Sequence, residues 1–370
     1  MLRKKLLFEQ LARSGSGAKE RKLAILGFFG PRDFLASALN DTEKKWLATC
    51  DAIPADALLA PHRHNLPEWM AQALQAQLGE DFWDLAEHLQ QPGTLDLRVN
   101  MLNAKRSDIQ KELAQAGIAS EATPYSPWGL RLQGKPALQK TDAFTRGAIE
   151  VQDEGSQLLA LLVDAHRGEM VVDFCAGGGG KTLALGAMMK NTGRLYAFDT
   201  SAHRLEGLKP RMARSGLNNI HTMVINDEKD ARIQRMWGKV DRVLVDAPCT
   251  GLGTLRRNPA LKWRVKPKSV EQMVQLQSAI LRSAAQLLKP GGRLIYATCS
   301  LLPQENEEVA QAFSQEFKQE FEALPMQTLL AKPVGELAHN LCTPTTGLYL
   351  RLWPHLHHTD GFFAASWTKK

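Results

Sequence analysis

The chain has 370 residues, of which 44% are hydrophobic, and carries a net charge of +7. This length allows two or three domains with ordinary apolar cores. No stretch approaches the roughly 20 uncharged apolar residues that span a bilayer, and the basic start MLRKKLLFEQLARSG lacks the apolar core of a secretory signal. The five cysteines form no C-x-x-C pair, which argues against a disulfide framework and against a metal site. We therefore expect a reducing cytoplasm.

The first 150 residues predict two regions. Residues 1–70 alternate short apolar-periodic segments with turns such as SGSG and GFFGPRD, which indicates a helical N-terminal region. Residues 71–150 predict a small α/β subdomain and a linker. Its helices are PEWMAQALQAQLG and SDIQKELAQAGI, the second capped by Ser107 and ended by Gly117, and its strands are LDLRVNML and WGLRLQ. The stretch QGKPALQKTDAFTRG has the composition of a connection.

Residues 151–370 alternate apolar strands with amphipathic helices. The predicted strands are 170–176, 193–199, 220–227, 240–248 and 291–299. Strands that are apolar nearly throughout and separated by helices indicate a parallel sheet covered on both faces. The clearest helix, SVEQMVQLQSAILRSAAQLLK, opens with a predicted capping box of Ser269 and Gln272. The runs GLYLRLWP and DGFFAASW at the end predict an antiparallel hairpin, so the sequence favours a Rossmann-like α/β methyltransferase sheet.

A glycine-rich loop, VVDFCAGGGGKT, follows the first of these strands. Such a turn lies at the carboxyl edge of a doubly wound sheet, where ligands bind, and its glycines allow close backbone approach. A Walker A loop would need glycine where Cys175 stands, and a dinucleotide fingerprint would need a small residue where Thr182 stands. S-adenosylmethionine fits the remaining pattern. The predicted cofactor segment comprises Cys175, Ala176, Gly177, Gly178, Gly179, Gly180 and Lys181.

Two acids end the next two strands. Asp199 lies 22 residues beyond Gly177 and is placed to accept the ribose hydroxyls of a nucleoside ligand. Asp227, at the end of the third strand, could meet an adenine amino group. Each acid could instead be a helix N-cap, a position that Asp favours.

Two cysteines reach the same edge of the predicted sheet. The fourth strand runs into Asp246-Ala-Pro-Cys249 and the fifth into Thr-Cys299-Ser. One cysteine at a strand end is usually buried packing, but two beside a ligand loop indicate chemistry. Methylation of a pyrimidine at C5 needs a thiolate that adds to C6 and an acid near N3, for which Asp246 is the candidate. The target base must also leave its stack, which requires a positive groove beside the pocket.

A basic run, RRNPALKWRVKPK at 256–268, follows the first of these cysteines. It holds six basic residues, one Trp and no acid, a mix that suits phosphate contact and base stacking. A solvated face is the simpler interpretation of any basic run. The predicted RNA-binding residues are Arg256, Arg257, Lys262, Trp263 and Arg264.

Three motifs make the chain resemble the RsmB/Sun-type RNA cytosine-5 methyltransferases: CAGGGGKT, DAPCTGLGTLRRNP and YATCSLLPQENEEV. The resemblance covers 151–370, and 70–150 resembles the family's small RNA-binding subdomain more loosely. It implies that Cys299 attacks the base, that Cys249 aids product release, and that Lys181 and Asp246 lie at the target base. It also implies S-adenosylmethionine and an RNA substrate. From the composition and the cysteine spacing we expect no membrane and no metal, and we expect a monomer.

Two features depart from the family. The usual loop is C-A-A-P-G-G-K-T, whereas Gly177 and Gly178 stand here in place of Ala-Pro. Two glycines add freedom to the unbound loop, which predicts weaker cofactor binding than an Ala-Pro loop has. The roughly 70 residues at the start are also too few for a full NusB-like helical domain, so the sequence leaves ribosomal and transfer RNA both open as substrates.

Other functions stay open at this point. A DNA cytosine-5 methyltransferase would use the Pro-Cys thiol, Cys249, as its nucleophile and would not need Cys299. A non-catalytic RNA-binding or assembly factor would not need either thiol. A small-molecule methyltransferase leaves the basic run unexplained. The three histidines His355, His357 and His358 are interpreted as a solvated loop.

Overall fold

The computed structural model describes residues 1–344 and 346–370, which form two compact units. The first unit combines Met1–Pro92 with Thr254–Val265, and the second combines Gly93–Gly253 with Lys266–Lys370. Across these described ranges, no helix has the length and apolar character needed to cross a membrane.

The first unit is helical, as predicted for residues 1–70, but it continues to Pro92 and includes the helix PEWMAQALQAQLG that the sequence assigned to the small α/β subdomain. One of its small cores consists of Ile25, Leu35, Leu39 and Leu47, and a capping box of Asn40 and Glu43 starts the helix that carries Leu47. Its elements are η1 Leu2–Lys4, α1 Lys5–Leu11, α2 Lys19–Leu26, α3 Arg32–Ser37, α4 Asp41–Asp51, η2 Ala55–Ala57, α5 Ala60–His64, α6 Glu68–Leu78, η3 Gly79–Asp81, α7 Phe82–His88 and α14 Leu261–Arg264.

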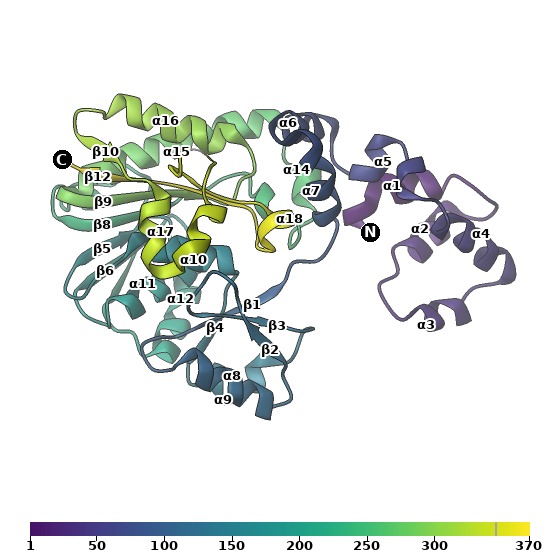
Figure 1. Cartoon of the computed structure of the whole chain (residues 1–370), viewed down its shortest axis with the longest axis horizontal. Helices are drawn as coiled ribbons and strands as arrows, with labels where there is room; N and C mark the ends of the chain where they lie inside the picture. The colour runs from purple at the N-terminus through teal and green to yellow at the C-terminus, as the bar shows by residue number, and fades with distance from the viewer. Residues whose placement is uncertain (345) are drawn as a thin grey trace. The chain divides into compact units, whose positions relative to one another are not determined.

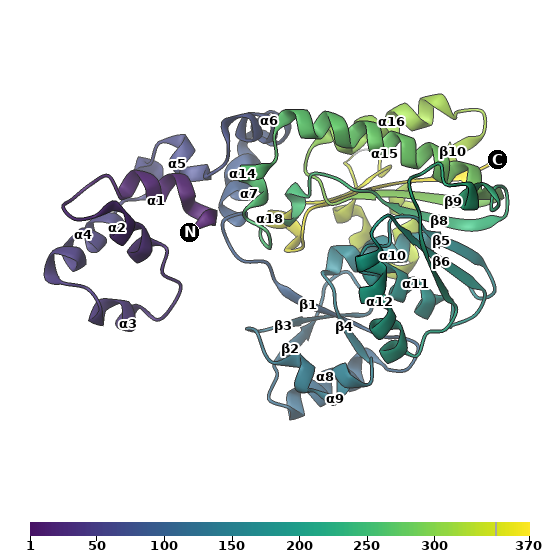
Figure 2. The ribbon, with the colours of Figure 1, turned by 180° about the vertical axis from the view of Figure 1, so that it is seen from behind.

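A small antiparallel sheet opens the second unit, with strand order β2-β3-β1-β4 and α8 and α9 beside it (Figure 2). Its elements are β1 Leu95–Val99, α8 Arg106–Gln115, β2 Ser120–Ala122, β3 Gly129–Leu132, η4 Leu138–Lys140, α9 Asp142–Thr145 and β4 Ile149–Val151. The predicted strands and the second helix are present. The sequence missed β2 and β4, and the expected connection contains η4 and α9.

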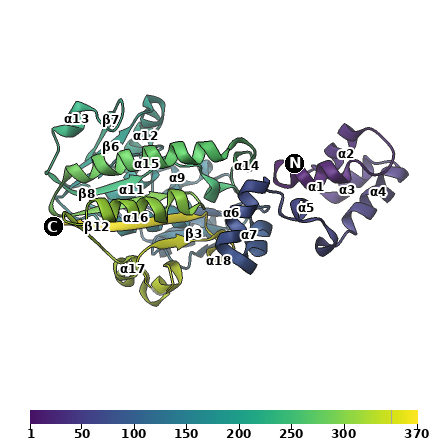
Figure 3. The same ribbon diagram turned by 90° about the horizontal axis from the view of Figure 1, so that it is seen from above.

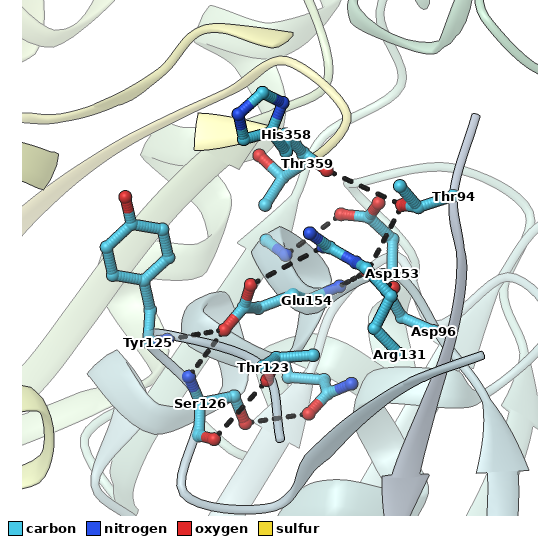
Figure 4. Close-up of polar contacts among 12 residues, drawn as sticks. Thr94, Asp96, Thr123, Tyr125, Ser126, Arg131, Asp153, Glu154, His358 and Thr359 are labelled. Atoms are coloured by element: carbon cyan, nitrogen blue, oxygen red, sulfur yellow. Dashed lines mark hydrogen bonds and ion pairs between the residues drawn. The ribbon is translucent and has the colours of Figure 1, made fainter. Parts of the chain in front are cut away.

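A buried polar network attaches this small sheet to α10 Glu154–Val163 (Figure 4). The carboxylate of Glu154 accepts hydrogen bonds from the backbone N–H groups of Tyr125 and Ser126 at 2.6 and 2.7 Å. Asp96 on β1 accepts two bonds from Arg131 on β3 and one from the backbone of Glu154. A buried carboxylate is costly unless it is hydrogen-bonded, so these contacts fix the small sheet to the helix.

Within the described part of the chain, the main sheet has eight strands, seven of them in the order β10-β12-β9-β8-β5-β6-β7, and β11 pairs with β12 (Figure 1). The five predicted strands, β5 to β9, pair in parallel, and β12 pairs antiparallel with β9, β10 and β11. The strands are β5 Met170–Asp173, β6 Arg194–Asp199, β7 Ile220–Val224, β8 Val240–Asp246, β9 Leu288–Thr298, β10 Phe321–Ala323, β11 Leu350–Leu352 and β12 Phe362–Lys369. The Rossmann-like prediction and the terminal hairpin are confirmed.

Helices cover both faces of this sheet. Alternate strand residues face opposite sides: Val171 packs in a core with α10, α11, α12 and α17, and Val172 packs with α13, α15 and α16. Figures 1 and 3 show α15 and α16 side by side along one face. The remaining elements are α11 Gly180–Met188, α12 Ala202–Ser215, α13 Ala231–Gln234, η5 Leu252–Thr254, α15 Pro267–Leu287, η6 Pro303–Glu305, α16 Glu307–Glu316, α17 Met326–Val334, η7 Gly335–Leu341 and α18 Pro354–His357.

Three local predictions are wrong. Helix α15 starts at Pro267 with Lys266 as N-cap, so Ser269 lies inside the helix and forms no capping box. Helix α8 is likewise capped by Lys105 and contains Ser107. The interpretation of 355–358 as a solvated loop is wrong for His357, which ends helix α18, is buried and bonds the backbone of Trp353 and Asn340, whereas His358 is exposed as expected.

Candidate active site

A cavity of about 680 Å³ lies at the carboxyl ends of β5, β6 and β8. Parallel strands end at a common edge, so loops that are distant in sequence meet there. All predicted catalytic and cofactor-binding residues except Gly179 line the cavity: Cys175, Ala176, Gly177, Gly178, Gly180, Lys181, Asp199, Asp227, Asp246, Cys249 and Cys299.

The glycine loop between β5 and α11 depends on two backbone conformations. Gly177 and Gly179 have φ values of 55° and 78°, a region that side-chain-bearing residues adopt at a cost. A Cβ at Gly179 would lie 2.2 Å from Leu208 Cδ1, whereas a Cβ at Gly177 would meet nothing within 4 Å. Gly179 therefore permits helix packing, and Gly177 leaves open space beside the cavity.

Asp199 holds the loop from the end of β6. Its Oδ2 accepts a 2.8 Å hydrogen bond from Gly177 N, and its Oδ1 accepts one of 2.7 Å from Ser201 N. Ser201, and not Asp199, is the N-cap of α12. The interpretation of Asp199 as a helix cap is therefore wrong.

Asp227 follows β7 and is exposed at the cavity wall. It accepts a 2.8 Å hydrogen bond from Lys229 N, but the N-cap of the nearby helix α13 is Asp230. The cap interpretation fails here too, and the carboxylate lies where a ligand in the cavity can reach it.

Lys181 and Asp246 form an ion pair of 2.6 Å across the cavity wall. Lys181 lies in the first turn of α11 and Asp246 at the end of β8. Burial alone would lower the pKa of Lys181, but the Asp246 carboxylate raises this pKa above its usual value. The lysine is therefore charged at neutral pH.

Asp173, the last residue of β5, is a cavity residue that the sequence analysis did not single out. Its Oδ2 accepts a 2.7 Å bond from Thr182 Oγ1, and its buried Oδ1 has no hydrogen-bond partner among the described residues. Burial raises the pKa of Asp173 to about 7. Its position at the end of a strand, directly before the glycine loop, was a signal that could have revealed it.

The two thiols meet at the cavity. Cys249 Sγ lies 3.3 Å from Cys299 Sγ, and both residues are partly buried. The pKa of Cys249 is raised by its hydrogen bond with Cys299, by burial and by its electrostatic interaction with Cys299. The expectation that two cysteines 50 residues apart become neighbours is confirmed, and neither sulfur is isolated in apolar packing away from the glycine loop.

Two arginines bind the glycine loop, Arg98 from outside the cavity and Arg211 from its wall, and no sequence motif predicted either contact. Arg98 on β1 is buried and donates to Gly180 O at 2.6 Å. Arg211 on α12 donates to Gly178 O and also pairs with Glu150 on β4 at 3.0 Å. Contacts between residues tens of positions apart left no local pattern in the sequence.

The basic run forms part of the first unit. Lys262 and Arg256 are 2% and 4% exposed and donate to Arg3 O and Pro92 O. Trp263 Nε1 donates to Leu2 O. Burial, with a contribution from Arg3, lowers the pKa of Lys262 to about 7. Lys262 and Arg256 are therefore structural residues here, which corrects the prediction that they contact RNA.

Arg257 and Arg264 are the members of the predicted RNA-binding set that are exposed. An exposed guanidinium is accessible to a phosphate group of RNA. The proposal that this run contacts RNA therefore rests on Arg257 and Arg264.

A family model described as 16S rRNA methyltransferase RsmB/F matches residues 160–368, more than half of the chain. The chain belongs to this family. A second model, described as the ferredoxin-like domain of RsmF/B-like methyltransferases, matches residues 66–139. These matches confirm the predicted family and its S-adenosylmethionine cofactor, and they place a ferredoxin-like domain where the sequence predicts a small α/β subdomain.

Relatives and solved structures agree over most of the chain. A probable ribosomal RNA small subunit methyltransferase B of Synechocystis is 34% identical, over 83% of this chain and 67% of the relative. One from Bacillus subtilis is 32% identical, over 94% of this chain and 76% of the relative. The crystal structure of PH0851 matches with a TM-score of 0.81 and 29% identity, over 100% of this chain and 88% of that one. A methyltransferase homolog from Pyrococcus horikoshii gives a TM-score of 0.71 and 30% identity, over 84% and 97% of the two chains.

Proposed function

We propose that the chain methylates C5 of a cytosine in small-subunit ribosomal RNA through a covalent adduct between Cys299 and C6. The observation that carries this proposal is the 3.3 Å approach of two thiols at the wall of the cavity that holds the glycine loop. The names of the relatives support ribosomal rather than transfer RNA as the substrate class. Action in the cytoplasm as a monomer stays a prediction.

The residues at the cavity fit S-adenosylmethionine. Asp173 Oδ1 is a buried acceptor without a partner in the described chain, and Asp199 and Asp227 add carboxylates for the hydroxyl and amino groups of the cofactor. Gly177 and Gly178 leave room for close backbone approach. When bound, the cofactor supplies an electrophilic methyl group.

Cys299 carries the first chemical step in this proposal. Its thiolate adds to C6 of the extruded cytosine, a sulfur–carbon bond forms, and C5 becomes nucleophilic. The ion pair of Lys181 and Asp246 lies at the same wall and orients the ring by hydrogen bonds to N3 and the exocyclic amine. After methyl transfer, loss of the C5 proton breaks the sulfur–carbon bond and restores the aromatic ring.

Cys249 suits the release step because its ionisation depends on Cys299. The interaction with Cys299 raises the pKa of Cys249, so it stays a neutral thiol in the free enzyme. Once the Cys299 sulfur is bonded to carbon, that sulfur carries no charge and no longer opposes ionisation of Cys249. Cys249 can then lose its own proton to solvent, and the resulting thiolate accepts the C5 proton.

A methyl-transfer assay tests the proposal. The protein is incubated with labelled S-adenosylmethionine and a small-subunit rRNA transcript, and digested nucleosides are analysed for 5-methylcytidine. Cys299→Ala should lower the rate by about 10⁴-fold or more. Cys249→Ala should accumulate a covalent protein–RNA adduct that survives denaturing electrophoresis.

Each other outcome identifies a competing function. An adduct with Cys299→Ala and none with Cys249→Ala would indicate the DNA-type mechanism. Absence of transfer by the wild-type protein to rRNA, tRNA and DNA would support a non-catalytic RNA-binding factor. A methylated base other than 5-methylcytidine would overturn the proposed chemistry.

A further inference from the structure

A buried carboxylate lies behind the two thiols, at the end of η6. Glu305 is 0% exposed, and it is not among the residues that line the cavity. A buried ionised carboxylate costs several kcal/mol unless its oxygens are hydrogen-bonded. The hydrogen-bond donors to the Glu305 carboxylate therefore show which parts of the fold this buried charge holds together.

The carboxylate binds the residue that follows each thiol. Thr250 donates to Glu305 through its backbone N–H at 2.8 Å and through its hydroxyl at 2.5 Å. Ser300 donates its hydroxyl to the same Oε2 atom that accepts the Thr250 hydroxyl. Gln277 on α15 donates to Oε1 at 3.1 Å. Charge-assisted bonds of this kind are about twice as strong as neutral ones.

Neighbouring amides hold the other side of each thiol. Gln277 also donates to Pro248 O at 3.0 Å, immediately before Cys249. Asn306 accepts from Thr298 Oγ1 and donates to Ser300 O at 3.1 Å, so it spans Cys299. The backbone on both sides of each sulfur is thus fixed by Glu305, Asn306 and Gln277 together.

We propose that Glu305 is a positioning residue that sets the separation of the Cys249 and Cys299 sulfurs and so allows Cys249 to act on the adduct that Cys299 forms. Strands β8 and β9 bring the two loops to one edge of the sheet, but the segments that carry the sulfurs extend beyond the paired residues. Glu305 supplies a charged side-chain link between these segments, in addition to the 2.8 Å backbone bond from Gly253 N to Cys299 O. The catalytic consequence rests on the proposed function, whereas the sulfur separation does not.

A thiol-oxidation experiment tests the separation without RNA. Diamide takes two electrons and two protons from a pair of thiols, so the thiols form a disulfide and diamide becomes the hydrazine. The full-length wild-type protein should form the Cys249–Cys299 disulfide, quantified by peptide mass spectrometry. Glu305→Gln, which removes one acceptor, should form it at least about 10-fold more slowly, even though the loss of the Glu305 charge lowers the pKa of Cys249 and by itself favours oxidation.

Two further variants separate positioning from folding. Glu308→Gln, at an exposed site in α16, is the matched control and should oxidise at the wild-type rate. Thr250→Val keeps the backbone bond to Glu305 and loses only the hydroxyl bond, so it should give an intermediate rate. If Glu305→Gln does not fold, as judged by circular dichroism, a wild-type oxidation rate in Thr250→Val overturns the proposal.

The catalytic arm measures the same variants with rRNA. Glu305→Gln should lower kcat and accumulate the covalent adduct, while the Kd values for S-adenosylmethionine and RNA stay within about 2-fold of the wild type. A folded Glu305→Gln with wild-type oxidation rate overturns the positioning role. Slower oxidation by Glu305→Gln, together with a wild type that does not methylate rRNA, would instead overturn the proposed function and leave the positioning role standing.

Discussion

Lys181 Nζ lies 2.6 Å from Asp246 Oδ2, which joins the first turn of α11 to the end of β8. Both side chains are largely buried, with 12% and 27% of their areas exposed. The lysine belongs to the cofactor loop and the aspartate to the loop that carries Cys249. This pair therefore connects the predicted cofactor-binding and base-binding sides of the cavity.

Removing either Lys181 or Asp246 should also abolish the contribution of the remaining residue to catalysis. Asp246→Asn leaves a buried lysine without its counter-charge, and Lys181→Met leaves a partly buried carboxylate without its own. We expect each single variant to lower the methylation rate by about 10²-fold, and the double variant to lose little more, because the two groups act as a unit. Single-turnover rates of the three proteins measure this.

An exposed lysine provides the control for that experiment. Lys209→Met removes a surface pair with Glu206 and should leave the rate unchanged. Fully additive losses in the Lys181 and Asp246 cycle would mean that the two residues act on the substrate independently.

The backbone conformation at Gly177 is unfavourable for alanine. Its φ of 55° costs an alanine about 1–2 kcal/mol, and Gly177 N also binds Asp199. Gly177→Ala should therefore weaken S-adenosylmethionine binding by about 5- to 20-fold, measured by titration calorimetry. This reverses, for the first of the two positions, the expectation that an Ala-Pro loop binds the cofactor more tightly.

Gly178→Ala is the matched control. Gly178 has no positive φ, and an added Cβ would lie 3.5 Å from Arg211 Nη1, an ordinary contact. It should change the Kd by less than about 2-fold. Tighter binding by Gly177→Ala would show that the loop adopts another backbone conformation with the cofactor.

The sequence predicted those elements whose physics is local. The parallel strands of the main sheet are apolar on both faces, so each can be predicted from its own residues without knowing which strands lie beside it. Ser120–Ala122 is short, polar and partly exposed, and it becomes strand β2 only through pairing with β3. The start of α15 was misplaced because Pro267 suits the first helical position and overrides the Ser269 signal.

The site residues likewise divide into those that local sequence predicted and those that depend on long-range contacts. Cys249 and Cys299 could be placed together because parallel strands end at one edge. Arg98, by contrast, reaches Gly180 across 82 residues, and no periodicity encodes that contact. The basic run was misjudged at Lys262 because composition does not show whether a charge meets phosphate or a backbone carbonyl.

Asp173 should make stability depend on pH. Burial raises its pKa from 3.8 to about 7, so between these values the folded chain keeps a proton that the unfolded chain has lost. The contribution of Asp173 to the free energy of unfolding therefore falls as the pH rises from about 3.8 to about 7 and stays at its lowest value above pH 7. Asp173→Asn removes the effect, so its melting temperature should exceed that of the wild type by an amount that grows from pH 5 to pH 7 and is constant above.

Melting curves at several pH values measure that difference. Asp142→Asn, in the small subdomain, provides a control in α9 away from the cavity. A difference between Asp173→Asn and wild type that does not vary with pH would mean that Asp173 is ionised throughout.

The basic run offers a test that separates buried from exposed charge. Arg264 is exposed, whereas Lys262 is buried, donates to Arg3 O and has its pKa lowered to about 7 by burial and by Arg3. Each phosphate contact contributes about 0.9 to the slope of log affinity against log salt for duplexes and about 0.7 for single strands. Arg264→Ala should therefore reduce that slope by nearly one unit for rRNA, and Lys262→Met should leave it unchanged. Filter binding across a salt series gives both slopes, and a smaller slope for Lys262→Met alone would show that the buried lysine leaves Arg3 O to bind RNA.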